Sequence, residues 1–147
     1  MLRPFVVADR AEYCRMAHDF YRCGVTDHVI PDSHIEKTAD TVLSGTPYAA
    51  IYMLEADGEL VGYALLAITW SQEGGGETIW IEELYILPQF RGKGYGTTFF
   101  SELRQTYPHA ARFRLEVEPD NEGAIRLYKR MGFVELPYGQ LVRDLGE

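Results

Sequence analysis

The sequence is poor in cysteine, has no excess of basic residues and contains no long apolar run. Only Cys14 and Cys23 occur among 147 residues, and a reducing compartment would keep both as thiols. Fourteen Lys and Arg stand against 22 Asp and Glu, a formal net charge of -8. This balance disfavours a nucleic-acid-binding surface, which needs clustered cations. No apolar run approaches the ~20 residues of a membrane span.

The chain also lacks clear signals for export and for metal binding. Its start, MLRPFVVADRAEYC, has no sufficiently long apolar stretch and no small-residue cleavage site, so a cytoplasmic location is expected. Cys14 and His18 lie four residues apart on an expected helix, but a zinc site needs further ligands that the sequence does not clearly supply. No metal site is predicted, and small buried thiols are the simpler interpretation of the cysteines.

Length and composition predict one domain over residues 1–147, with 46% hydrophobic and 24% charged residues. Apolar periodicity, capping residues and glycine turns set the expected elements. Strands are expected at 2–7, 48–55, 60–70, 77–88, 111–118, 133–137 and 138–145, and helices at 9–22, 33–45, 97–107 and 119–132. Asp57-Gly58 predicts a hairpin turn. The order β-α-α-β-β-β-α-β-α-β-β indicates an α/β (α+β) fold, a mixed sheet of about seven strands with helices on both faces.

One segment, QFRGKGYG at 89–96, places three glycines among Arg91, Lys93 and Tyr95. It follows an expected strand and precedes an expected helix, so main-chain N–H groups without intrahelical partners would point outward there. Such a turn binds anions, and the two cations suit a phosphate. The spacing fits neither the nucleoside-triphosphate loop nor the dinucleotide fingerprint. A glycine-rich surface turn with no ligand is the alternative.

Two stretches resemble the signatures of the GCN5-related N-acetyltransferase (GNAT) family. In ELYILPQFRGKGYG, the matching positions are Arg91, Gly94 and Gly96. In EVEPDNEGAIRLYKRMGF, they are Asn121, Ala124, Tyr128, Gly132 and Phe133. The close match covers roughly residues 77 to 135, and the first 76 residues agree only in the order of their elements. The resemblance implies a mostly antiparallel sheet and transfer of an acetyl group from acetyl-CoA to an amine.

The resemblance also implies the cofactor-binding residues. The glycine segment would hold the coenzyme A pyrophosphate, and the strand before it would pair with the pantetheine amides where it separates from the strand at 111–118. Asn121 would either bind the cofactor or cap its helix. The residues implied are Leu84, Tyr85, Ile86, Arg91, Gly92, Lys93, Gly94, Tyr95, Gly96, Thr97, Asn121 and Tyr128.

Acetyl transfer needs an acid for the leaving thiolate and a base for the amine. The resemblance gives the acid role to Tyr128, and a tyrosine that only packs against the sheet is the alternative. Glu82 and Glu83 interrupt an apolar strand, where a carboxylate has a raised pKa. Strict alternation would place one of them with Trp80, Leu84 and Ile86 and the other with Ile81, Tyr85 and Leu87. The resemblance favours Glu82 as the base, directly or through water, with Glu83 as the second candidate. A glutamate that is solvated or paired with Arg112 or Arg114 is the alternative.

The acceptor is predicted from charge alone. The resemblance implies that it would lie between the two early helices, the 71–76 loop and the closing strands. His28 and His34 could border it, although ordinary surface histidines are the simpler interpretation. Glutamates expected near it suggest a small cationic amine. These are Glu73, Glu82, Glu83, Glu116 and Glu118. Two alternatives remain open: an acyl-CoA sensor without transfer, and an acetyltransferase that acts on a protein amine. A homodimer is possible, but no diagnostic interface is recognised, and no nucleic acid or membrane partner is expected.

Overall fold

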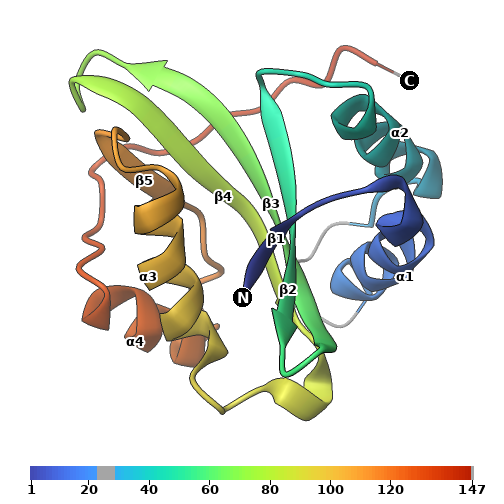
Figure 1. The fold of residues 1–147 in the computed structure, drawn as a ribbon. Coiled ribbons are helices and arrows are strands. Elements are labelled where there is room, and N and C mark those ends of the chain that lie inside the picture. Colours follow the sequence, from blue (N-terminus) through green and yellow to red (C-terminus); the bar gives the residue numbers. More distant parts are fainter. Residues whose placement is uncertain (23–28, 147) are drawn as a thin grey trace.

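The computed structural model describes residues 1–22 and 29–146 as a five-stranded sheet with helices on both faces (Figure 1). The strands are β1 (Leu2–Pro4), β2 (Ala49–Ala56), β3 (Glu59–Ser71), β4 (Gly76–Ile86) and β5 (Arg112–Leu115). They lie in the order β1-β2-β3-β4-β5, antiparallel except for the parallel β4–β5 pair. The predicted fold class is confirmed, with fewer strands than expected. Cys23 and His28 fall outside the described residues.

The helices cover the two faces in pairs. Helices α1 (Arg10–Phe20) and α2 (Asp32–Leu43) lie on one face, and α3 (Tyr95–Thr106) and α4 (Glu122–Arg130) lie on the other (Figure 1). Short 3₁₀ turns at Val7–Asp9 and Pro88–Phe90 lead into α1 and toward α3. No helix in the described part of the chain is long and apolar enough to cross a membrane.

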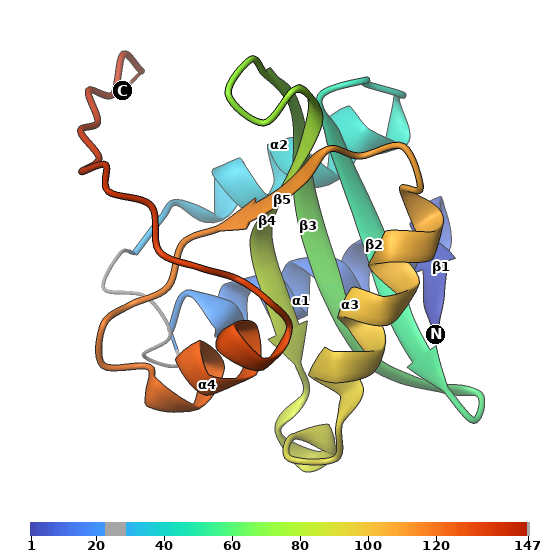
Figure 2. The same ribbon diagram turned by 90° about the vertical axis from the view of Figure 1, so that its left-hand side faces the viewer.

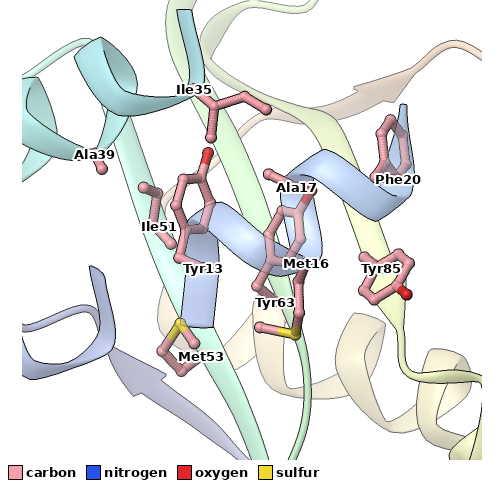
Figure 3. Close-up of a cluster of buried hydrophobic side chains, with 10 residues drawn as sticks. All are labelled: Tyr13, Met16, Ala17, Phe20, Ile35, Ala39, Ile51, Met53, Tyr63 and Tyr85. Atoms are coloured by element: carbon pink, nitrogen blue, oxygen red, sulfur yellow. The ribbon is translucent and has the colours of Figure 1, made fainter. Parts of the chain in front are cut away.

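Each pair of helices buries its own apolar cluster against the sheet. Beneath α1 and α2, Tyr13, Met16 and Ala17 pack on strand residues that include Met53 and Tyr63 (Figure 3). Beneath α3, the rings of Phe99 and Phe100 and the side chain of Leu103 pack on the opposite face of the sheet. Burial of these side chains, at about 25 cal/mol per Å² of apolar surface, is the main force that fixes the layers.

The hairpin between β2 and β3 forms at the predicted dipeptide. Asp57 and Gly58 have φ angles of 53° and 77°, the positive values that a two-residue type I′ turn requires at both positions. The turn joins Ala56 to Glu59, which are paired across the two strands. This prediction is confirmed.

Strand β4 contains a bulge that breaks the expected alternation of side chains. Leu65 of β3 pairs with Glu83, but Leu66 pairs with Ile81, which leaves Glu82 as the extra residue. Ile81 therefore packs in the cluster under α3, whereas Tyr85 packs under α1. The prediction that Ile81 and Tyr85 share a face was wrong, because the bulge shifts the side-chain parity of the strand by one residue.

The two closing strands expected at 133–137 and 138–145 are not formed, so the sheet has five strands instead of about seven. After Gly132 the described chain runs across the front of the sheet and then leaves the body of the molecule toward its C-terminal end (Figure 2). Phe133 packs against the cluster under α3, but the apolar side chains that follow it are exposed, Leu141 fully and Val134 to 85%. The side chains of this segment alternate as in a strand, but a strand also needs a neighbouring strand to pair with its main-chain groups. Within the described chain, no strand pairs with this segment.

Candidate functional site

A cleft opens where β4 and β5 separate. Their pairing ends at Ile81 and Leu115, while β4 continues to Ile86 against β3. Residues of both strands, of the glycine segment and of α4 line a cleft of about 900 Å³. The predicted separation of these strands is confirmed. Among the described residues, it leaves one edge of β4, from Glu82 onward, without a strand partner.

The glycine segment turns sharply at the mouth of this cleft. Gly92 and Gly94 have φ angles of 74° and 85°, and a Cβ on either would point into open space. Gly94 is the N-cap of α3 and supplies no side-chain cap, so main-chain N–H groups of the first helical turn have no intrahelical partner. The predicted sequence of strand, glycine turn and helix is confirmed.

The third glycine has a different function in the fold. A Cβ on Gly96 would lie 2.8 Å from Cδ2 of Leu127 on α4, closer than atoms can approach. Gly96 therefore allows α3 and α4 to pack closely, and α4 is the helix that carries Tyr128.

The two cations of the segment take different positions. Arg91 lines the cleft, donates from Nε to the Ile86 carbonyl at 2.7 Å and stacks over the Tyr85 ring. Lys93 is not among the lining residues, and its Nζ lies 5.7 Å from the centre of the Phe90 ring. Every other residue predicted to bind the cofactor lines the cleft. Their roles remain predictions.

Tyr128 reaches the cleft from α4. Its ring packs edge-on against Phe100 at 5.8 Å and lies 5.9 Å from Phe133, and burial raises the pKa of its hydroxyl. Within the described part of the chain no hydrogen-bond partner of this hydroxyl is found, so the hydroxyl can donate to a ligand in the cleft. Asn121, which also lines the cleft, caps α4 by accepting from the Ala124 N–H at 3.3 Å.

The two adjacent glutamates of β4 have different surroundings. Glu82, on the bulge, is exposed to the cleft; desolvation by the cleft walls raises its pKa, and nearby Glu116 raises it further. Glu83 is only 7% exposed and accepts hydrogen bonds from the hydroxyls of Tyr21 and Tyr63. Burial raises the pKa of Glu83, and the two phenols oppose that rise.

Tyr21 is a lining residue that sequence reasoning missed. It follows the last residue of α1 and is 62 residues away from Glu83 in the chain. No local pattern marks it, because its position depends on how α1 packs across the sheet. Phe20 and Trp80 line the same cleft and were not predicted as site residues either.

Part of the predicted acceptor region lies elsewhere. Glu73 is in the turn between β3 and β4, where it binds Arg112 at 3.1 Å and the Tyr138 hydroxyl at 2.9 Å. It does not line the cleft, so the structure does not bring it together with the other carboxylates of the predicted acceptor region. His34 is exposed on α2 and does not line the cleft either. Glu116 and Glu118 do line it, together with Glu82 and Glu83.

Known proteins that resemble this chain are acetyltransferases. Residues 15–133 match the model of the acetyltransferase (GNAT) family. Thialysine N-epsilon-acetyltransferase of Mus musculus is 34% identical over 88 residues, which are 56% of this chain and 49% of that protein. Spermine/spermidine N(1)-acetyltransferase of Bacillus subtilis is 29% identical over 82 residues, 52% of this chain and 54% of that protein. The chain thus spans about half the length of these relatives.

A solved structure matches the fold over almost the whole chain. AAC(6')-Iy, in complex with the bisubstrate analogue CoA-S-monomethyl-acetylneamine, superposes with a TM-score of 0.78 at 17% sequence identity. The match covers 98% of this chain and 97% of that one. At this low sequence identity, the structural similarity is evidence for a shared fold alone.

Proposed function

The chain belongs to the acetyltransferase (GNAT) family, and from that premise we propose that it transfers the acetyl group of acetyl-CoA to a primary amine. The proposal rests mainly on the cleft between β4 and β5, which is lined by the glycine turn, Glu82 and Tyr128. Direct attack in a ternary complex needs only that donor and acceptor be held together, without a covalent enzyme intermediate. We extend the proposal to all of residues 1–147 as one N-acetyltransferase domain.

The residues present fit coenzyme A. The open turn at Gly92 and Gly94 leaves room for a diphosphate to approach the main chain, and the uncapped start of α3 offers N–H donors and the positive end of the helix dipole. Arg91 adds a full charge beside them. The unpaired edge of β4 around Leu84 offers main-chain groups to the pantetheine amides. The substrate supplies the acetyl thioester.

Two side chains would move the protons. Glu82 would take a proton from the amine, whose nitrogen forms a bond to the thioester carbon while the carbon–sulfur bond breaks. Tyr128 would give its proton to the departing sulfur, because burial raises its pKa and keeps the phenol protonated. A strand N–H at the open edge of β4 would hold the thioester oxygen.

A small cationic amine is the acceptor that the cleft suits best. Four carboxylates line it, those of Glu82, Glu83, Glu116 and Glu118, and such a wall attracts positive charge. The mouse relative is named for thialysine and the Bacillus subtilis relative for spermine and spermidine, which supports the same class of acceptor. An acceptor on a protein and a non-catalytic acyl-CoA sensor are the two competing functions. We further propose a cytoplasmic location, with neither nucleic acid nor membrane as a partner.

Assembly as a homodimer is also proposed. The described C-terminal segment exposes Leu141, Val142 and Leu145, and β5 is the last strand of the sheet. A second copy could cover both. Sedimentation at micromolar concentration should give a dimer for the natural chain and a monomer for Leu141→Asp; a natural chain that sediments as a monomer refutes this arrangement.

The proposed reaction is tested by incubating the protein with acetyl-CoA and a set of amines that contains thialysine, spermidine and an aminoglycoside. Release of free CoA that depends on the amine, with the acetylated amine identified by mass spectrometry, is the expected result. Saturable binding of CoA without turnover of any amine would favour the sensor. Acetylated polypeptides in a cell extract, without turnover of small amines, would favour the protein acceptor.

A further inference from the structure

Among the described residues, the buried carboxylate of Glu83 has two phenol partners and no cation. The Tyr63 hydroxyl donates to Oε1 at 2.7 Å, and the Tyr21 hydroxyl donates to Oε2. In the part of the chain that the structure describes, no Lys or Arg forms an ion pair with it. A carboxylate this deeply buried is costly unless a positive charge or several donors compensate it. The two phenols compensate this carboxylate without neutralising it, so its negative charge can still attract a cationic group from the cleft.

Tyr21 is the side chain through which such a group could reach Glu83. Tyr63 is fully buried, whereas Tyr21 is half-buried and lines the cleft. The proton of the Tyr21 hydroxyl is directed at Glu83, so its oxygen retains the capacity to accept a hydrogen bond from another donor. An ammonium group is such a donor, and it can only donate. Hydrogen bonds in such a chain also strengthen one another.

The geometry holds Tyr21 in this orientation. Its ring packs edge-on against Phe20 at 5.0 Å, and its hydroxyl is fixed by Glu83. Glu83 in turn is fixed by Tyr63, whose ring stacks on that of Tyr85 at 5.8 Å and packs edge-on against that of Tyr13, from α1, at 4.9 Å (Figure 3). A side chain whose rotamer is fixed before binding loses little entropy when a ligand arrives.

We propose that Tyr21, oriented by Glu83, forms the subsite that receives an ammonium group of the acceptor. The inference rests on the proposed acetyltransferase function and adds to it a residue from α1 and the chemical class of its ligand. Tyr21 contacts the acceptor, and Glu83 acts through Tyr21 as a positioning residue and as the buried negative charge behind it. The cleft residues that face coenzyme A are not part of this subsite.

The test compares Tyr21→Phe and Glu83→Gln with Tyr52→Phe. The last variant removes a hydroxyl that pairs with Tyr107 at 3.3 Å, away from the cleft. With spermidine and thialysine as acceptors, Tyr21→Phe should raise the KM for the amine by about tenfold or more, the usual worth of a hydrogen bond to a charged group. The KM for acetyl-CoA should change by less than about twofold, because Tyr21 is not expected to contact the cofactor. Glu83→Gln should act in the same direction, and Tyr52→Phe should change neither constant.

An unchanged amine KM in Tyr21→Phe would overturn the subsite, and so would an equal rise in the KM for acetyl-CoA. Titration calorimetry of both amines into the CoA-loaded protein separates this result from failure of the proposed function. If an amine binds the natural chain and Tyr21→Phe weakens that binding, the subsite is supported. This holds even when no amine is acetylated, in which case only the proposed function is refuted. Absence of binding of either amine to the natural chain overturns the subsite. Should Glu83→Gln fail to fold, the comparison of Tyr21→Phe with the natural chain is sufficient to test the subsite.

Discussion

The side chain of Arg91 returns to the strand that precedes it and donates from Nε to the main-chain carbonyl of Ile86 at 2.7 Å. This bond ties the glycine turn to the end of β4 and holds the guanidinium at the cleft, over the Tyr85 ring. Arg91→Ala removes a fixed charge beside the turn and should weaken coenzyme A binding by about tenfold or more. Calorimetric titration with CoA measures the effect.

Lys93→Ala is the matched control for Arg91. It removes a charge of the same sign from the same turn, but Lys93 does not line the cleft. We expect at most about a threefold loss of affinity, typical of an exposed charge. Equal losses in the two variants would mean that net charge, rather than the position of Arg91, governs binding.

Gly94→Val tests the open turn itself. At a φ of 85° a β-branched residue is strained, and its side chain would stand where the ligand must approach. Gly45, after α2, has a similar φ of 88° and equally open surroundings, so Gly45→Val imposes comparable strain away from the cleft. Both variants should lose about 1–3 kcal/mol of unfolding free energy, but only Gly94→Val should lose CoA binding. Retained affinity in Gly94→Val would contradict the proposed phosphate site.

The parts of the site that the sequence predicted are those formed by neighbours in the chain. The strand, the glycine turn and the start of α3 follow one another within residues 76–106, so local turn and capping chemistry was sufficient to foresee the arrangement. The second motif placed Tyr128 on α4 for the same reason. Each of these features depends on main-chain conformation over a few residues.

The features that were missed depend on contacts between distant segments. The bulge at Glu82 is defined only by its register against Leu65 and Leu66 of β3, which alternation within one strand does not reveal. Tyr21 joins the site only because α1 crosses the sheet above Glu83. The residues after Gly132 have a strand-like pattern, but pairing needs a partner that the described chain does not provide.

Tyr128→Phe should separate catalysis from packing. The phenyl ring keeps the edge-on contact with Phe100, so the unfolding temperature and CoA affinity should stay unchanged. Loss of the proton donor should lower kcat by about 10²- to 10⁴-fold. Tyr107→Phe removes another half-buried hydroxyl, one bonded to Tyr52 outside the cleft, and should leave kcat unchanged. A near-normal kcat in Tyr128→Phe would reduce its role to packing.

The pH profile tests Glu82 as the base. A base must be deprotonated to act, so activity should fall as the pH drops through the pKa of Glu82, which desolvation and Glu116 both raise. The acidic limb of kcat/KM should therefore lie above the range of an ordinary carboxyl group. Glu82→Gln should remove this limb and lower kcat.

Glu116→Gln gives the sharper version of the same experiment, because it leaves the base in place. Removing the neighbouring negative charge makes the carboxylate of Glu82 easier to form, so its pKa falls and the acidic limb moves to lower pH. Glu118→Gln removes a carboxylate that also lines the cleft but is not among the causes that raise the pKa of Glu82. It is the matched control and should leave the limb in place. The limb is followed by measuring kcat/KM from acid to neutral pH with saturating acetyl-CoA. A limb that stays in place in Glu116→Gln, or that persists in Glu82→Gln, would assign the titration to another group.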